Sequence, residues 1–276
     1  MKEPNVSEPK ANHAFYRKVY KQTGEAELAM HICAPKTPAA PSPAIVFFFG
    51  GGWTGGAPDQ FFEHCAYFAS RGLVAISAEY RVKSRHGATP YECVKDGKSA
   101  LRWVRAHAAE LGIDPHRIAA GGGSAGGHVA ACTATINGFE EEDEDLTVSS
   151  KPNALVLFNP VIDTTPTGWL PGAKVLGDRA EDLSPAHHVV SGIPPCIIFH
   201  GTADKGVPFE NVARFCRLMT DAGNTCELVG FEGAGHGFFN HVSRRPDNDP
   251  NAYTETVRAA DRFLAKLSFL EGDPTL

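Results

Sequence analysis

A serine set among glycines is the feature of this chain whose residue types most directly suggest chemistry. The segment GGGSAGG places Ser124 after an apolar stretch at 117–120 and before a run of small residues at 125–135. A strand, a sharp turn and a helix in this order hold a serine hydroxyl out as a nucleophile, and nearby glycines leave room for the turn. By itself the pattern also fits an ordinary glycine-rich turn or a phosphate-binding loop, although the Gly-Lys-Ser/Thr ending of the latter is missing.

An acid and a base that could activate this serine follow two later apolar stretches. HGTAD ends at Asp204, and GAGHGF contains His236. In open α/β sheets the loops at the carboxyl ends of the strands form the site, and the chain order serine, aspartate, histidine is found there. We therefore expect His236 to take the proton of Ser124 and Asp204 to orient the imidazole. Asp163, after another apolar stretch, is the alternative acid.

A run of three glycines supplies the remaining group that acyl transfer needs. FFFGGGW occupies residues 47–53, at the end of an apolar stretch. The tetrahedral intermediate of acyl transfer carries an oxyanion, and the loss of one preorganised N–H donor to it costs about 3 kcal/mol. Consecutive glycines allow the main chain to turn its N–H groups toward that oxygen. Together the four motifs predict acyl transfer on Ser124.

The elements that must position these motifs alternate along the chain. Short unbroken apolar runs are typical of strands buried on both faces, and they alternate here with amphipathic runs of helical period. This alternation predicts an α/β fold with a mostly parallel central sheet flanked by helices on both faces. We expect one domain over residues 1–276, in which residues 1–26 form a loosely ordered N-terminal arm. Strands are expected at 27–33, 44–49, 73–77, 117–120, 154–158, 196–200 and 226–231, and helices at 59–71, 91–109, 125–135, 209–222 and 251–269.

The charge balance argues against two classes of partner. With 26 Lys and Arg against 32 Asp and Glu, the net charge is −6, which offers no general attraction to nucleic acid or to an anionic membrane. No apolar run approaches the ~20 residues of a membrane-spanning helix. The acidic run at 140–145 is expected to be a solvated loop.

Cysteine usage and the first residues indicate a compartment. The seven cysteines form no CxxC pair and have mostly apolar neighbours, so we expect buried free thiols, no metal site and a reducing environment. Residues 1–10 contain no apolar signal region, which favours a cytoplasmic location, or export if the sequence was trimmed.

From Glu27 onward the chain resembles a known group of enzymes. The motifs that carry the resemblance are FFFGGGW, AEYRV, GIDPHRI, GGGSAGGHVAA, LSPAHHV, HGTADKGVPF and GAGHGF. They resemble the hormone-sensitive-lipase-like and BD-FAE (feruloyl and acetyl-xylan esterase-like) branch of the α/β-hydrolases. The resemblance implies a Ser-His-Asp carboxylesterase that uses no cofactor, with the N–H groups of Gly51, Gly52 and Ala125 as oxyanion donors.

Departures from that group concern the glycine loop and the space around the site. Phe49 stands where relatives usually have a histidine that orders the glycine loop, and only 49 residues precede the triple glycine, too few for a large helical cap. A small or absent cap leaves an open site, which suits short acyl groups, including acetyl or feruloyl esters displayed on carbohydrate. Candidate walls of that site are Trp53 and Trp169, together with Phe61 and Leu170.

Two other functions remain as alternatives at this point. A small amide or formamide hydrolase would use the same residues, and a non-catalytic binding protein could share the fold. The expected partner is a small-molecule or carbohydrate ester, and the oligomeric state is left open.

Overall fold

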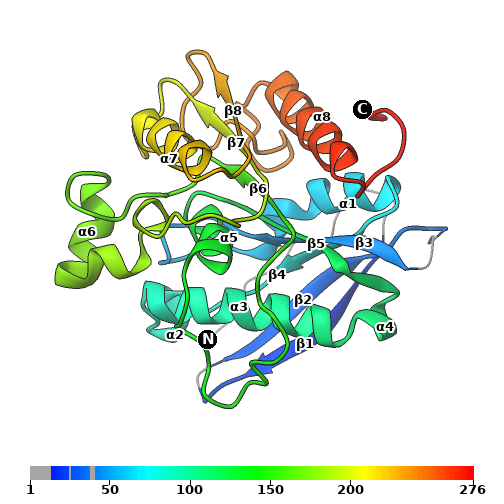
Figure 1. Cartoon of the computed structure of the whole chain (residues 1–276). Helices are drawn as coiled ribbons and strands as arrows, with labels where there is room; N and C mark the ends of the chain where they lie inside the picture. The colour runs from blue at the N-terminus through cyan, green and yellow to red at the C-terminus, as the bar shows by residue number, and fades with distance from the viewer. Residues whose placement is uncertain (1–13, 25, 38–40) are drawn as a thin grey trace.

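One eight-stranded sheet runs through the molecule (Figure 1). The computed structural model describes residues 14–24, 26–37 and 41–276. The strand order is β1-β2-β4-β3-β5-β6-β7-β8; β2 pairs antiparallel with β1 and β4, and the other neighbouring pairs are parallel. This is the mostly parallel sheet that the sequence predicts. The strands are β1 (Phe15–Gln22), β2 (Glu27–Cys33), β3 (Ser42–Phe48), β4 (Val74–Ala78), β5 (Ile113–Gly123), β6 (Ala154–Phe158), β7 (Cys196–Gly201) and β8 (Cys226–Phe231).

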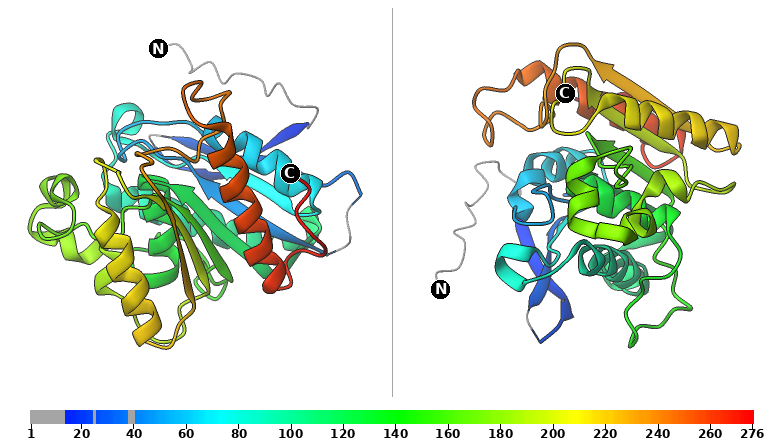
Figure 2. Two further views of the ribbon diagram at one scale, coloured as in Figure 1. Left: turned by 90° about the horizontal axis from the view of Figure 1, so that it is seen from above. Right: turned by 90° about the vertical axis from the view of Figure 1, so that its left-hand side faces the viewer.

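Helices cover both faces of this sheet (Figures 1 and 2). In β3, Ile45 and Phe47 pack with α1 and α8, whereas Val46 and Phe48 pack with the helices of the opposite face. Successive side chains of a strand point to opposite faces, so an unbroken apolar run is what a strand covered on both sides requires. One face carries α1 (Phe62–Ser70) and α8 (Pro250–Lys266), and the other carries α3 (Pro90–Ala106), α5 (Ala125–Thr135) and α7 (Phe209–Asp221).

The segment between β6 and β7 is the place where a cap could form. It contains α6 (Leu170–Leu176), η2 (Gly177–Leu183) and η3 (Pro185–His187). Buried residues of α6 and η2 pack against Val94 of α3 and Cys132 of α5, so this segment lies over the ends of two helices. The remaining short elements are η1 (Pro58–Phe61), α2 (Lys83–His86) and α4 (Ala108–Leu111). Among the residues that the structure describes, no helix combines the length and the apolar character needed to cross a membrane.

The N-terminal region differs from the expected loose arm. Residues 15–22 form β1, an edge strand paired with β2 from Phe15↔Cys33 to Gln22↔Glu27. Tyr20 anchors it, because its side chain is buried and its hydroxyl donates to the main-chain oxygen of Glu79 at 2.6 Å. An edge strand exposes most of its side chains, so the apolar pattern that marks a strand is weak in FYRKVYKQ. The rest of the expected arm, residues 1–13, lies outside the described residues.

The acidic run is also different from the expected solvated loop. Glu140 pairs with Lys98 at 2.7 Å, and Glu141 pairs with Lys21 and Arg81 at 2.8 Å each. The cations come from β1, from α3 and from the loop after β4, so only the tertiary fold places them opposite the acids. We call this set the ion-pair clamp; its members are Lys21, Arg81, Lys95, Asp96, Lys98, Arg102, Glu140, Glu141 and Glu144.

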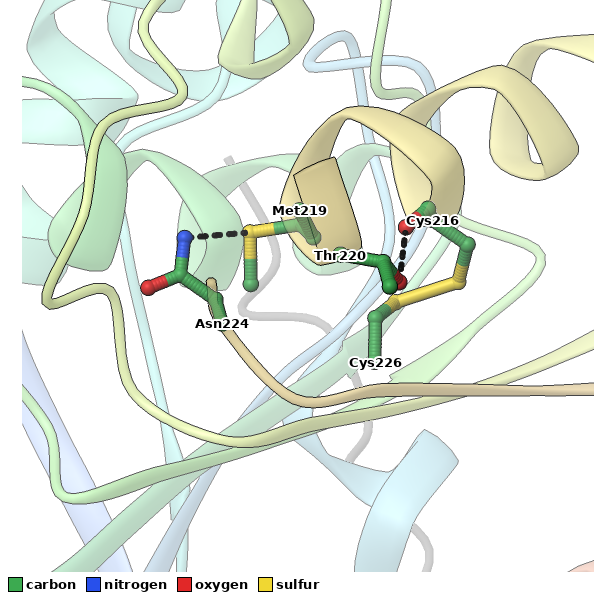
Figure 3. The surroundings of a disulfide bond; sticks show 5 residues. All are labelled: Cys216, Met219, Thr220, Asn224 and Cys226. Carbon is green, nitrogen blue, oxygen red and sulfur yellow. Dashed lines mark hydrogen bonds between the residues drawn. A yellow bond between two sulfur atoms is a disulfide. The ribbon is translucent and has the colours of Figure 1, made fainter. Parts of the chain in front are cut away.

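The cysteines depart from expectation at one pair. Cys216 of α7 and Cys226 of β8 form a disulfide, with their Cα atoms 5.4 Å apart (Figure 3). The helix packs directly on the strand that follows it, which brings the two cysteines together across the connecting turn. The other five cysteines are free and buried, as expected. With one pair bonded, the cysteine content no longer argues for a reducing compartment.

Candidate active site

Ser124 occupies the turn between β5 and α5 with a strained backbone. Its φ is 54° and its ψ is −118°, a left-handed conformation that costs a non-glycine residue about 1–3 kcal/mol. The neighbouring glycines are required because the turn lies against the end of β3. A Cβ on Gly122 would lie 2.6 Å from the main-chain oxygen of Phe48, and a Cβ on Gly126 would clash with the same oxygen. The turn therefore has the geometry that the sequence predicts for a nucleophile.

The structure brings Ser124, His236 and Asp204 together in one hydrogen-bonded chain. The Nε2 atom of His236 lies 2.9 Å from Oγ of Ser124, and its Nδ1 atom lies 2.8 Å from Oδ2 of Asp204. A carboxylate only accepts, so Nδ1 carries the proton and Nε2 is left as the acceptor for the serine hydroxyl. The three residues follow β5, β7 and β8, at the carboxyl ends of parallel strands.

The surroundings of Asp204 keep it ionised. Its other oxygen, Oδ1, accepts hydrogen bonds from the main-chain N–H groups of Gly206 (2.7 Å) and Val207 (2.9 Å). Burial by itself would raise the pKa of this carboxyl, but the hydrogen bonds from His200, His236 and Val207 together hold its pKa well below the usual range. Asp204 therefore stays a carboxylate and fixes the imidazole in the tautomer that can accept the serine proton.

Asp163, the alternative acid, is engaged elsewhere. Its Oδ1 accepts from the N–H (2.9 Å) and hydroxyl (2.6 Å) of Thr165, and its Oδ2 pairs with Arg214 at 2.6 Å. The carboxylate next to His236 is that of Asp204. The geometry favours Asp204 over Asp163 as the partner of the base.

The glycine loop faces Ser124 across the pocket. Gly51 (φ 140°) and Gly52 (φ 62°) adopt conformations that favour glycine, and both line the pocket beside the serine. Within residues 14–24, 26–37 and 41–276 their N–H groups have no hydrogen-bond partner. Ala125 is the first residue of α5, where the N–H has no acceptor in a preceding turn. These three N–H groups are thus available for an oxyanion.

Two side chains order the glycine loop in place of the missing histidine. The ring of Phe49 stacks on Tyr80 with centroids 4.3 Å apart, and the Tyr80 hydroxyl donates to the main-chain oxygen of Phe49 at 2.6 Å. Gly50 donates its N–H to Oε1 of Gln60 at 2.6 Å. Contacts from η1 and from the loop after β4 therefore order the glycine loop with phenylalanine at position 49.

Gln60 also connects the glycine loop to the loop that carries the base. Its Nε2 donates to Oδ1 of Asn240 at 2.8 Å, and Nδ2 of Asn240 donates to the main-chain oxygen of Gly237 at 2.7 Å. Asn240 is only 1% exposed, so this bridge is shielded from competing water. Amide side chains therefore connect the two sides of the pocket, beside the ion pair between Asp59 and Arg244.

The pocket at Ser124 has a volume of about 550 Å³, and polar and apolar surface both line it. Glycines of the two loops line it together with Ser124 and His236, and no residue of α6, η2 or η3 is among the described lining residues. The sequence did not indicate the other lining residues, because single amides and arginines in loops carry no periodic signal. These are Gln60, Asn159, Phe239, Asn240, Arg244 and Arg245.

The candidate wall residues are not among the described residues that line this pocket. Trp53 is 2% exposed, and its indole N–H donates to Nδ1 of His128 at 3.2 Å, so it packs in the core beneath the glycine loop. Trp169 packs beside Trp53 and donates to the main-chain oxygen of Gly206 at 2.6 Å. Phe61 is fully buried and Leu170 is 52% exposed on α6. An aromatic or apolar side chain suits a pocket wall and a core position equally well, so the sequence could not separate the two.

Metal ligands do not gather in the described part of the chain. No three His, Cys, Asp or Glu side chains within it are arranged as a metal site would need.

Comparison with known proteins gives consistent relatives. The BD-FAE family model matches residues 30–218, and the dienelactone hydrolase family model matches residues 183–270. Carboxylesterase NlhH of Mycobacterium tuberculosis (strain CDC 1551 / Oshkosh) is 32% identical over 218 residues, covering 72% of this chain and 67% of that protein.

Solved structures of one esterase resemble the whole chain. Esterase 2 of Thermogutta terrifontis, phosphoramylated by tabun, is 50% identical with a TM-score of 0.89, covering 96% of this chain and 98% of that chain. Its butyrate-bound form is 49% identical with a TM-score of 0.87, covering 94% and 96% of the two chains. The family match spans more than half of the sequence, and the fold and the esterase relatives agree with it. The chain therefore belongs to the BD-FAE family of α/β-hydrolases and is a carboxylesterase.

Proposed function

We propose that this carboxylesterase hydrolyses short-acyl esters through an acyl-enzyme on Ser124, with His236 as general base and Asp204 as the acid that orients it. The observation that carries the proposal is the continuous hydrogen-bonded chain from Ser124 Oγ through His236 to Asp204, with distances of 2.9 and 2.8 Å. Separate elements supply the three side chains, and the backbone strain at Ser124 is the kind that clusters at functional sites.

The reaction follows from this geometry in two halves. His236 Nε2 takes the Ser124 proton as Oγ attacks the ester carbonyl, and the N–H groups of Gly51, Gly52 and Ala125 stabilise the oxyanion. The imidazolium then protonates the leaving alcohol, which departs and leaves the acyl group on Oγ. Water, deprotonated by the same imidazole, attacks the acyl-enzyme, and release of the carboxylic acid restores Ser124.

The pocket walls support a short acyl group. Much of the lining near Ser124 is glycine main chain and amide side chains, which offers little apolar surface to bury a long alkyl chain. The esterase 2 structure with bound butyrate shows that a protein 49% identical to this chain accommodates a four-carbon acid. Acetyl or feruloyl esters on carbohydrate belong to this proposal, because no residue of α6, η2 or η3 is among the described residues that line the pocket and a bulky alcohol can approach it.

A chain-length series tests the proposal directly. Rates are measured on p-nitrophenyl esters from acetate to palmitate, together with acetylated and feruloylated sugars and a matching aryl amide. We expect a maximum at two to four acyl carbons, sugar-ester activity and a far slower amide reaction. A maximum at long chains would contradict the short-acyl assignment.

Covalent labelling tests the assignment of the nucleophile separately. Paraoxon is expected to add one phosphoryl group at Ser124, detected by mass spectrometry, and to leave Ser124→Ala unlabelled. Label at another residue, or full activity in Ser124→Ala, would overturn the assignment.

A further inference from the structure

The pocket beside Ser124 has a charge opposite to that of the whole chain. The chain carries a net charge of −6, yet Arg244 and Arg245 both line the pocket, and no aspartate or glutamate is among its described lining residues. Charged residues that line a cleft with walls of low polarisability set the potential that a substrate meets there. The described residues that line the pocket therefore include two cationic side chains and no carboxylate.

The two arginines differ in how far their charge is compensated. Arg244 Nη1 pairs with Asp59 Oδ1 at 2.8 Å. Arg245 Nη1 donates to the main-chain oxygen of His236 at 3.2 Å, and no carboxylate partner for it is found within the described ranges. A guanidinium has five N–H donors, so Arg245 retains both its charge and most of its donors for a ligand.

Asn159, at the same pocket, holds the loop of the base rather than a ligand. Asn159 is fully buried, and its Oδ1 accepts from the N–H of Gly237 at 2.9 Å, which fixes the orientation of the amide. Its Nδ2 has no hydrogen-bond partner within the described residues, but this atom has almost no accessible surface and does not face the pocket that Asn159 helps to line. Arg245 is therefore the uncompensated group that an incoming substrate can reach.

We propose that the alcohol part of the natural ester carries a carboxylate, which Arg245 binds. This inference rests on the proposed function, because it names the substrate class of the same site. We assign the carboxylate to the alcohol part because the leaving alcohol oxygen must receive its proton from His236 Nε2. Arg245 lies on the same side of the pocket as His236, since its guanidinium donates a hydrogen bond to the main-chain oxygen of that residue. Short-acyl esters of hydroxy acids or of acidic sugars have this chemistry.

Matched substrates of equal size test the charge preference. We compare 4-acetoxybenzoate with its neutral carboxamide counterpart 4-acetoxybenzamide, each corrected for its rate of hydrolysis by hydroxide. The corrected ratio of kcat/KM is expected to favour the carboxylate about tenfold at low salt, which corresponds to ~1.4 kcal/mol. The preference should weaken at high salt, because ions screen the exposed guanidinium.

Variants of Arg245 connect the preference to one side chain. Arg245→Lys keeps the charge and should retain most of the ratio, Arg245→Gln should bring it close to one, and Arg245→Glu should invert it. Arg217→Gln removes the same charge from an exposed position on α7 that does not line the pocket, and it should leave the ratio unchanged.

Three outcomes would overturn the inference. The first is a wild-type ratio at or below one, and the second is a ratio that Arg245→Gln does not alter. The third is a preference seen only when the carboxylate is on the acyl side, as in mono(p-nitrophenyl) adipate against the adipamate ester. Failure of the proposed function looks different: no ester of either charge would be hydrolysed, and paraoxon would not label Ser124.

Discussion

The pocket at Ser124 and the ion-pair clamp both contain charged side chains, but these are paired in the clamp and partly unpaired in the pocket. In the clamp, Asp96 is fully buried and its oxygens accept from Lys21, from the Arg81 guanidinium and from the Arg81 main chain. In the pocket, Arg245 has no carboxylate among its described contacts. Groups satisfied within the fold hold elements together, whereas groups left unsatisfied around a strained turn remain available to a substrate.

The strain at Ser124 gives the largest expected effect and separates stability from activity. Ser124→Gly should lower kcat by about 10⁴-fold or more, because the nucleophile is lost. It should also raise the free energy of unfolding by about 1 kcal/mol relative to Ser124→Ala, because glycine adopts a φ of 54° without the Cβ penalty. Urea denaturation of the two variants measures the difference. Equal stability would show that the turn stores no strain.

Removal of Asp96 tests whether the clamp is purely structural. Asp96→Ala leaves Lys21 and Arg81 without their buried partner, which should lower the free energy of unfolding by about 3–5 kcal/mol. Because Asp96 does not line the pocket, the activity per folded molecule should be retained. Asp178→Ala, at an exposed position, is the matched control and should change stability by no more than about 0.5 kcal/mol. A comparable loss in both variants would contradict the structural role of the clamp.

The amide bridge of the pocket should affect catalysis more than binding. Gln60→Ala removes the acceptor of the Gly50 N–H and the donor to Asn240, so the two loops lose their connection. We expect kcat for p-nitrophenyl butyrate to fall about 10–100-fold with little change in KM, since loose oxyanion donors weaken the transition state most. Gln22→Ala on β1 is the control. A change confined to KM would assign Gln60 to substrate binding instead.

The smallest expected effect is a pH dependence of the clamp. Burial alone would raise the pKa of Glu141, but Lys21, Lys95 and Arg81 lower it from 4.5 to about 2. A carboxyl with a depressed pKa contributes stability above its unfolded pKa and loses it as the pH falls, here from 4.5 to about 2. The side chain is 25% exposed, so screening limits the contribution to about 1 kcal/mol. Glu141→Gln should therefore be less stable than the wild type at pH 7, with the difference vanishing toward pH 2; a constant difference would contradict the assignment to this ion pair.

Local motifs made much of the chemistry predictable from the sequence. Local turn geometry requires the glycines around Ser124 and the triple glycine. The loops that carry Asp204 and His236 each follow an apolar run, and this pattern predicted that all four motifs lie at the carboxyl edge of the sheet. Residues without a local signature were not found this way. Gln60, Asn159 and Arg245 are isolated polar residues in the sequence, and only the tertiary structure shows that they line one pocket.

The same limit explains the other departures from expectation. β1 is an exposed edge strand whose polar side chains do not show the strand pattern, and the acidic run looked solvated because its partners lie on distant elements. The large aromatic side chain of Trp53 suits a pocket wall, yet it is buried and donates a hydrogen bond to His128 in the core. The sequence by itself determined the α/β architecture and the candidate nucleophile, acid and base, because periodicity and turn chemistry are local. The tertiary structure decided which charges are paired and which face the substrate, because pairing depends on contacts between residues far apart in the chain.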